Sequence, residues 1–218
     1  TRLSRGLGDV YKRQTHDWRE GTYKNYFWMV PHNLSTLIDT IGGKEFAEKR
    51  LDSLFTRLDA DYHQDWFAAG NEPDFQVPWI YNWVAKEQKT NDVISRIIDE
   101  MYSSEEDGLP GNDDLGTMGA WYVFASLGLY PLIPGVGGFS TNIPQFMESK
   151  ITLGNGNILN ISKDDTNGKF LKKIELNEVP LESSWVSWNK IKLGGEMKFF
   201  TSNSISKNNF TEEPPSFK

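Results

Sequence analysis

The first two thirds of the chain carry apolar side chains at helical spacing. Apolar positions recur three and four residues apart, which is typical of helices that bury one face against a core. Gly42-Gly43 ends the first of these patterns, as glycine commonly does at the end of a helix. The spacing predicts helices over residues 34–41, 44–57, 79–84 and 91–101. Paired helices joined by polar loops are typical of part of an α/α barrel.

A further helical pattern, which begins near Leu115, is apolar on nearly every face. No charged residue occurs between Leu115 and Met147. The positions i, i+3, i+4 and i+7 of this pattern are Met118, Trp121, Tyr122 and Ala125. We expect such a helix to lie inside the helical core. The apolar run is broken by glycines and by Pro131 and falls short of the roughly 20 residues that cross a bilayer, so a membrane span is not predicted.

Beyond Pro131 the pattern changes to short runs that are typical of β-strands. These runs cover residues 150–153, 158–162, 169–176 and 198–201. Asn155-Gly156 and Asn167-Gly168 lie between runs and predict two hairpins, because Asn-Gly is the strongest short-range hairpin signal. The expected fold is therefore mainly α with a β-rich C-terminal unit. It would consist of part of an α/α barrel followed by a small antiparallel β subdomain.

These patterns divide the chain into four segments. Residues 15–134 form the expected helical unit and residues 135–201 the β-rich unit, with the boundary near Gly135 to Gly138. Residues 202–218 form a polar tail, which we expect to be poorly ordered. The sequence Asp9-Val-Tyr-Lys-Arg-Gln14 is similar to the translation of a common sequencing adapter. Residues 1–14 are therefore interpreted as an adapter-derived artefact and are excluded from the fold.

Composition narrows the classes of function. The chain of 218 residues has eight Trp, eight Tyr and thirteen Phe, and flat aromatic rings suit the apolar faces of sugars, although most such rings fill cores. The net charge is -7 and Lys and Arg are not clustered, so nucleic acid is not an expected partner. The absence of cysteine excludes disulfides, a thiol nucleophile and a thiolate zinc site.

Polar side chains gather at the start of the apolar helix. Asn112, Asp113 and Asp114 follow a turn rich in glycine and proline. Such residues commonly cap the free N–H groups of a helix, and capping is the commoner explanation. The helix dipole also favours an ionised carboxylate. If Asp114 lines a pocket, it therefore suits the role of a general base or a metal ligand.

A second carboxyl lies in the opposite kind of sequence environment. Glu20 is surrounded in the sequence by the aromatic residues Trp18, Tyr23, Tyr26 and Trp28. Aromatic neighbours would desolvate this carboxyl and favour its protonated form. One protonated and one ionised carboxyl are the acid and base of inverting glycoside hydrolysis. An ordinary exposed Glu is the competing explanation.

Three segments, taken in order, carry a resemblance to a known family. They are Glu20-Gly21 with Tyr26-Phe-Trp-Met-Val-Pro-His32, then Gly70-Asn-Glu-Pro73, then Gly111-Asn-Asp-Asp-Leu-Gly-Thr-Met-Gly-Ala-Trp-Tyr-Val-Phe124 with Leu127-Gly-Leu-Tyr-Pro131. Together they resemble the signature of glycoside hydrolase family 92, the calcium-dependent, inverting, exo-acting α-mannosidases. The resemblance implies part of an (α/α)6 catalytic barrel. It also implies hydrolysis of terminal α-linked mannose from glycans.

The resemblance assigns roles to individual residues. It implies that Glu20 is the general acid and Asp114 the general base. It implies a Ca²⁺ site formed by Asn71, Glu72 and Asp114, which agrees with the preference of Ca²⁺ for oxygen ligands. The substrate-binding residues that it implies are Trp28, His32, Asn112 and Asp113. The chain departs from the family pattern at Asn33, Asn112, Asp74-Phe75, Thr117 and Gly119, positions that concern sugar contacts and linkage preference.

The resemblance extends over residues 17–195 and implies that more of the parent chain lies upstream. The missing part would be the family's N-terminal β-sandwich and the first barrel helices, which would act as a partner of this chain. Without them apolar helix faces lack neighbours, so we expect the fragment alone to be poorly stable and inactive. The family resemblance implies a periplasmic or extracellular location. The alternatives are another α/α-barrel glycosidase or lyase, and a non-catalytic glycan-binding module.

Overall fold

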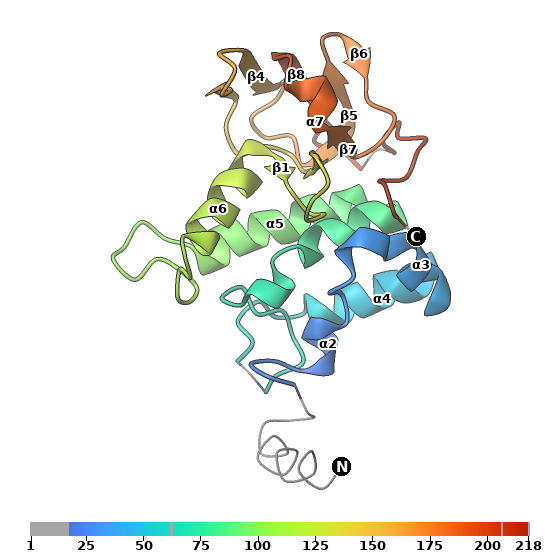
Figure 1. Cartoon of the computed structure of the whole chain (residues 1–218), viewed down its shortest axis with the longest axis vertical. Helices are drawn as coiled ribbons and strands as arrows, with labels where there is room; N and C mark the ends of the chain where they lie inside the picture. The colour runs from blue at the N-terminus through green and yellow to red at the C-terminus, as the bar shows by residue number, and fades with distance from the viewer. Residues whose placement is uncertain (1–17, 62, 206, 218) are drawn as a thin grey trace, which may run out of the picture.

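The computed structural model describes residues 18–61, 63–205 and 207–217. Helices make up the N-terminal part of the molecule and β-sheets the C-terminal part (Figure 1). Helices α5 (Glu87–Met101) and α6 (Thr117–Leu127) lie between the two parts. The fold is therefore α plus β, as predicted. The adapter interpretation of residues 1–14 falls outside the described residues and stays a prediction.

The N-terminal helices follow the predicted pattern closely. They are α2 (Tyr23–Tyr26), η2 (Pro31–Asn33), α3 (Leu34–Thr40), α4 (Lys44–Leu54), η3 (Glu72–Asp74) and η4 (Val77–Val84). The helices predicted over 34–41, 44–57 and 91–101 are confirmed as α3, α4 and α5. The segment predicted over 79–84 is a buried 3-10 helix that begins at Val77. Asn33 caps α3, because its side-chain oxygen accepts a hydrogen bond from the Thr36 N–H at 3.4 Å.

Helix α6 buries one face, which corrects the prediction of a helix buried on all sides. Met118, Trp121 and Ala125 are buried, whereas Tyr122 is 39% exposed and Val123 is 55% exposed. The described elements pack against only one side of this helix. Its other apolar side is therefore open to solvent in the described structure, although the sequence gives it the composition of a core helix.

The C-terminal unit contains two sheets. The first has the strand order β1 (Leu129–Tyr130), β2 (Gly138–Thr141), β7 (Trp185–Ser187) and is antiparallel. The second has the order β3 (Glu148–Thr152), β4 (Ile158–Lys163), β8 (Gly195–Ser202), β5 (Phe170–Leu176), β6 (Val179–Pro180). Helix α7 (Trp188–Ile191) connects β7 to β8. Strand β8 is parallel to β4, so the expectation of an entirely antiparallel subdomain is corrected to one antiparallel and one mixed sheet.

One of the two predicted hairpins is present. Asn155-Gly156 lies in the turn that joins the antiparallel strands β3 and β4. Asn167-Gly168 does not form a hairpin, because β8 lies between β4 and β5 in the sheet. The sequence missed a tight hairpin between β5 and β6. There Asn177 and Glu178 both adopt left-handed backbone conformations, with φ of 52° and 66°.

The two tight turns make a testable pair. Glu178→Gly should stabilise the β5–β6 hairpin by about 0.5–1 kcal/mol, because glycine adopts the left-handed conformation without the steric cost that Glu bears. Gly156→Ala should destabilise the β3–β4 hairpin by about 1 kcal/mol for the opposite reason, since Gly156 has a φ of 84°. Hydrogen exchange of the amides in each hairpin measures these local free energies. Equal exchange in Glu178→Gly and the unmodified protein would contradict the explanation.

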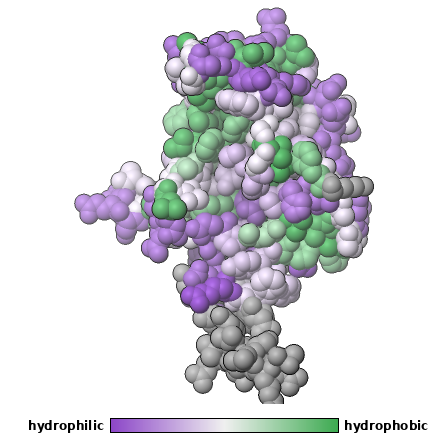
Figure 2. Space-filling view, viewed as in Figure 1, coloured by the Kyte–Doolittle hydropathy of each residue, from purple (hydrophilic) through white to green (hydrophobic). Residues whose placement is uncertain are grey.

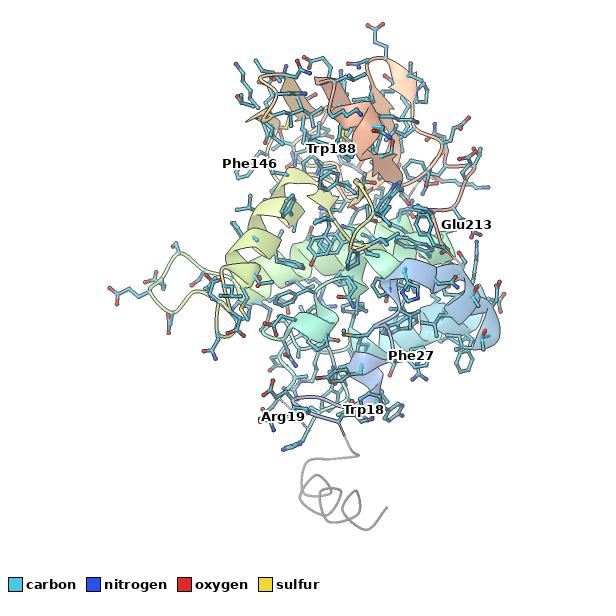
Figure 3. The ribbon with its side chains drawn as sticks, viewed as in Figure 1. Trp18, Arg19, Phe27, Phe146, Trp188 and Glu213 are labelled. Carbon is cyan, nitrogen blue, oxygen red and sulfur yellow. The ribbon has the colours of Figure 1, made fainter. Side chains whose placement is uncertain are left out.

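The C-terminal tail makes specific contacts, which corrects the expectation that it is poorly ordered. Residues 207–217 run from the β unit back to the helical unit, and Glu213 lies between the two (Figure 3). Phe210 packs against the core of the β unit. The polar contacts include Thr211 N–H with the Glu182 carbonyl, Trp83 Nε1 with the Pro215 carbonyl, and an ion pair between Lys44 and Glu213.

Two hydrophobic clusters hold the molecule together. The larger one lies in the helical unit around Trp79 and Trp83, and the smaller one lies in the β unit around Met197 and Phe199. The larger cluster supports the loops that carry the predicted site. Within the described residues, no helix is both long enough and apolar enough to cross a membrane.

Candidate active site

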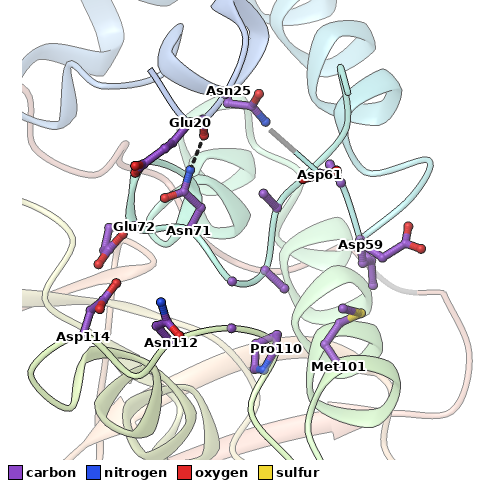
Figure 4. Close-up of a pocket in the computed structure, with 17 residues that line it drawn as sticks. Glu20, Asn25, Asp59, Asp61, Asn71, Glu72, Met101, Pro110, Asn112 and Asp114 are labelled. Atoms are coloured by element: carbon purple, nitrogen blue, oxygen red, sulfur yellow. Dashed lines mark hydrogen bonds between the residues drawn. The ribbon is translucent and has the colours of Figure 1, made fainter. Parts of the chain in front are cut away.

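A pocket of about 490 Å³ opens where separate segments of the helical unit meet (Figure 4). Its walls come from residues 20, 21 and 25, from residues 58–61, 68–72, 110–112 and 114, and from Met101. The pocket brings together five of the predicted site residues: Glu20, Asn71, Glu72, Asn112 and Asp114. Figure 4 shows Glu20, Glu72 and Asp114 on the same side of the pocket, with Glu72 between the other two. This volume is within the range of small-molecule sites.

Two glycines allow two of the motifs to approach each other closely. A Cβ atom on Gly70 would lie 2.5 Å from the Pro110 carbonyl oxygen, and one on Gly111 would lie 2.9 Å from the Gly70 carbonyl oxygen. Larger residues at these positions would therefore push the two turns apart. The close backbone contact places the turn that carries Asn71 and Glu72 directly against the turn that carries Asp114.

Glu20 is held mainly through its backbone. Its φ of 55° is in the left-handed region, which is uncommon for a residue other than glycine. Asn71 Nδ2 donates a hydrogen bond of 2.6 Å to the Glu20 carbonyl oxygen. The Glu20 side chain is 50% exposed, and Arg19 Nε lies 3.5 Å from its Oε1. The desolvated surroundings expected from the aromatic sequence are therefore not found among the described residues.

The aromatic segment after Glu20 packs away from the pocket. Trp28 is 1% exposed and belongs to the core of the helical unit, where its ring lies edge-on to Phe27. His32 is exposed in η2, and its carbonyl oxygen accepts a hydrogen bond from the Phe217 N–H at 2.7 Å. The structure brings neither Trp28 nor His32 into the pocket, although both were predicted to bind substrate. Figure 3 shows Trp18 beside Arg19 at the end of the helical unit.

Adjacent aspartates at the start of α6 have different environments. Asp113 Oδ1 accepts a hydrogen bond of 3.0 Å from the Gly119 N–H in the first turn of the helix, whose N-cap residue is Gly116. This side chain therefore satisfies a free N–H group of the helix, which agrees with the simpler explanation. Asp114 lines the pocket and is exposed, with a φ of 39°. Its carbonyl oxygen accepts a hydrogen bond from the Thr117 hydroxyl. Asp114 thus lies at the surface, although the helix that follows it was expected to lie inside the helical core.

Helix α6 is fixed relative to the turn that carries Glu72. Trp121 Nε1 donates a hydrogen bond of 2.9 Å to the Phe75 carbonyl oxygen, just beyond η3. The Trp121 ring also stacks on Tyr102, with the ring planes only 3° apart. These contacts connect the start of α6 to η3 through the buried side of the helix. They therefore help to keep Asp114 on the same wall as Glu72.

Asp74 is a buried carboxyl that the sequence did not single out as a site residue. Its Oδ2 accepts hydrogen bonds from the Ala68 N–H at 2.8 Å and from Asn25 Nδ2 at 2.9 Å. Complete burial raises the pKa of Asp74 to about 7, and the two hydrogen bonds oppose this rise. Oδ1 has no hydrogen-bond partner among the described residues. The feature of the sequence that could have identified Asp74 is its position directly after Glu72-Pro73.

The pocket is strongly acidic. The carboxylates that line it are Glu20, Asp59, Asp61, Glu72 and Asp114. Among the described lining residues there is no Lys, Arg or His. Arg57 forms a two-bond ion pair with Asp59 at the rim, with distances of 3.0 and 2.9 Å. Carboxylates gathered in this way repel one another, and a bound cation would offset that repulsion.

The residues that line the pocket fit a hard cation only in part, although they supply the oxygen atoms that such an ion prefers. Within residues 18–61, 63–205 and 207–217, no group of three or more His, Cys, Asp or Glu side chains could hold a metal ion. Glu72 and Asp114 offer carboxylate oxygens, and Asn71 and Asn112 offer amide oxygens. Ca²⁺ accepts such oxygens together with carbonyls and waters. The described residues therefore suit Ca²⁺ better than a metal that prefers nitrogen or sulfur ligands.

Comparison with known proteins gives a consistent family assignment. A family model described as the glycosyl hydrolase family 92 catalytic domain matches residues 4–203, so the match begins inside the segment interpreted as adapter-derived. A family 92 α-mannosidase from Bacteroides thetaiotaomicron, solved with mannoimidazole, superposes with a TM-score of 0.83. The two sequences are 30% identical, and the superposition covers 92% of this chain and 28% of that one.

Two further relatives are more distant. A family 92 inverting mannosidase from Bacteroides thetaiotaomicron VPI-5482 has a TM-score of 0.77 at 24% identity, over 91% of this chain and 30% of that one, which shows the fold alone. A curated protein described as an uncharacterized secreted glycosidase, from Arthroderma benhamiae, is 27% identical over 187 residues, 83% of this chain and 23% of that protein. This chain therefore spans about a quarter of the length of these relatives. The match of the family model to most of the sequence, together with the fold, shows that the chain belongs to glycosyl hydrolase family 92.

Proposed function

We propose that this chain is part of an inverting, calcium-dependent exo-α-mannosidase that removes terminal α-linked mannose from glycans. The observation that carries the proposal is the shared pocket of Glu20 and Asp114, with the Asn71-Glu72 turn beside them. Membership of family 92 supports a glycosidase, and the solved relative at 30% identity is an α-mannosidase. The stereochemical part of the proposal rests on the resemblance of the motifs that carry Glu20 and Asp114 to the family signature.

The proposed reaction uses two carboxyl groups in complementary states. Glu20, protonated, donates its proton to the glycosidic oxygen as the bond from that oxygen to C1 breaks. Asp114, ionised, takes a proton from a water molecule whose oxygen forms the new bond to C1 from the opposite face of the ring. One proton is given and one is taken, and the configuration at C1 inverts.

The proposed calcium ion would be held by oxygens of Asn71, Glu72 and Asp114. When bound, Ca²⁺ would supply positive charge and a ligand sphere for sugar hydroxyls within an acidic pocket. The chain's own contribution is to keep these oxygens together, through the close contact of Gly70 with Gly111. We also propose that Asn112 and Asp113, which follow Gly111 in the same turn, contact the substrate. Of these two residues, Asn112 lines the pocket.

The rest of the parent protein is the proposed partner of this chain. Exposed apolar residues occur on α6, at Tyr122 and Val123, and also at Met29, between α2 and η2, and at Phe46 in α4. These are the positions at which further barrel helices would pack in a complete (α/α)6 barrel. We therefore propose that the described chain alone is poorly stable and inactive. A periplasmic or extracellular location is supported by the secreted description of the curated relative.

The test uses the complete parent protein. Incubation with the methyl glycosides of α-1,2-, α-1,3- and α-1,6-mannobiose, followed by ¹H NMR from the first minutes, should show β-mannose as the first free sugar before mutarotation. α-Mannose as the first product would contradict the inverting mechanism. Unsaturated products would favour a lyase. Binding to these sugars without any hydrolysis would favour a non-catalytic glycan-binding module.

A further inference from the structure

Asp74 joins two turns that carry acidic groups of the pocket. A single oxygen atom, Oδ2, accepts hydrogen bonds from Asn25 Nδ2 at 2.9 Å and from the Ala68 N–H at 2.8 Å. Asn25 lies in the segment that begins at Glu20, and Ala68 lies in the segment that leads to Asn71. The fully buried carboxyl of Asp74 therefore connects the segment around Asn25 with the segment around Ala68, and Asn25 and Asp74 are 49 residues apart in the sequence.

Asn25 transmits this connection toward Glu20. Its Oδ1 accepts hydrogen bonds from the Thr22 N–H at 2.9 Å and from the Thr22 hydroxyl at 3.1 Å. The first of these bonds is one half of the capping box of α2. Asn25 Nδ2 also donates to the Trp66 carbonyl oxygen at 2.7 Å. Both Thr22 and Asn25 are buried. A fixed Asn25 thus fixes Thr22, which is only two residues from Glu20.

The hydrogen bond from Asn71 to Glu20 closes the connection into a ring. Asn71 Nδ2 donates to the Glu20 carbonyl oxygen at 2.6 Å, and Asn71 is three residues before Asp74. The ring runs along the chain from Glu20 to Asn25, across to Asp74, back to Asn71 and across again to Glu20. A left-handed φ at Glu20 persists only where the surrounding structure holds it, and this ring provides that restraint.

We propose that Asp74 is a positioning residue whose buried carboxyl fixes the separation between the Glu20 turn and the Asn71-Glu72 turn. Its consequence for catalysis rests on the proposed acid and base roles in the pocket. Burial of a carboxyl is costly, and the hydrogen bonds from Asn25 and Ala68 to Oδ2 offset part of that cost while they join the two turns. Asp74 does not line the pocket, so it acts through the residues that it holds.

The test compares substitutions at Asp74 in the complete protein. Asp74→Ala removes both hydrogen bonds, so amides in residues 21–25 and 68–72 should exchange faster with solvent. It should also lower kcat by about 10- to 100-fold while KM changes much less. Asp74→Asn should restore both properties, because one amide oxygen can accept both hydrogen bonds. The matched control is Asn82→Ala, which removes a buried polar side chain bonded to Ser140 and Thr90, away from the pocket.

Each result either supports or overturns the proposal that Asp74 positions the two turns. Faster exchange in both turns with a lower kcat in Asp74→Ala, rescue by Asn and an unchanged kcat in Asn82→Ala support the proposal. Unchanged exchange over residues 21–25, or a retained kcat despite faster exchange, overturns it. If Asp74→Ala does not fold, Asn25→Ala breaks the same connection from the other side with the same expected results, and retained kcat there overturns the proposal. If the unmodified protein does not hydrolyse α-mannosides, the proposed function fails, and the exchange data alone decide whether Asp74 holds the turns.

Discussion

Glu20→Gln or Asp114→Asn in the complete protein is expected to lower kcat on a mannobiose by about 10²- to 10⁴-fold, the usual contribution of a general acid or base. Both side chains line one pocket, and each substitution keeps the size of the side chain while removing its ability to transfer a proton. Binding of the sugar should be retained in Glu20→Gln, because the change does not alter the shape of the pocket. Asp114→Asn is measured at saturating Ca²⁺, because Asp114 is also a proposed Ca²⁺ ligand. Steady-state kinetics gives kcat, and calorimetry gives the affinity of the inactive variants.

The two variants should differ in their response to the leaving group. A dinitrophenyl mannoside has a leaving group that needs no proton, so Glu20→Gln should hydrolyse it far better than it hydrolyses a mannobiose. Asp114→Asn should remain slow on both substrates, because activation of water is still required. The same sensitivity to the leaving group in both variants would contradict the division of roles.

The control for these variants is a carboxylate outside the pocket. Asp165 lies in a turn of the β unit, where its Oδ1 accepts a hydrogen bond from the Asn167 N–H at 2.9 Å. Asp165→Asn keeps an acceptor at that position and changes the net charge by the same amount as the other two variants. Its kcat should equal that of the unmodified protein. A comparable loss in Asp165→Asn would show that the effects at Glu20 and Asp114 come from net charge or folding.

Local patterns in the sequence predicted the elements that depend on local interactions. Helices α3, α4 and α5 follow from apolar spacing, and the β3–β4 hairpin follows from Asn155-Gly156. The position of β8 could not be predicted in this way, because a strand from the end of the chain separates β4 from β5. Pairing between distant strands depends on the whole sheet, and turn residues report only on the neighbouring strands. Asn167-Gly168 therefore carried a hairpin signal without a hairpin.

Only part of the site could be predicted, because some residues of the sequence motifs line the pocket and others pack elsewhere. Asn71, Glu72 and Asp114 meet because Gly70 and Gly111 permit backbone contact, a fact that no local pattern contains. Trp28 belongs to the same motif segment as Glu20, yet it packs in the core. The sequence cannot distinguish an aromatic residue that binds sugar from one that fills a core, since both uses select the same residue type.

Removal of calcium from the complete protein is expected to abolish activity, with a loss of about 100-fold or more, the magnitude expected when a charge that stabilises the transition state is lost. Five carboxylates line the pocket and none of its described lining residues is Lys, Arg or His, so a bound Ca²⁺ would supply positive charge that the lining side chains lack. Activity should return with added Ca²⁺ after EDTA. Mg²⁺ should restore it poorly, because Mg²⁺ requires near-octahedral geometry and dehydrates reluctantly.

Substitutions of two carboxylates in the same pocket distinguish a specific calcium site from a general need for positive charge. Glu72→Gln should raise the Ca²⁺ concentration that gives half of the maximal activity by about 10- to 100-fold, as loss of a ligand does. Asp59→Asn should leave that concentration nearly unchanged, because Asp59 is already paired with Arg57. If both variants shift the concentration equally, the ion responds to the net charge of the pocket and not to a ligand set that includes Glu72. Full activity in EDTA would exclude calcium from the mechanism.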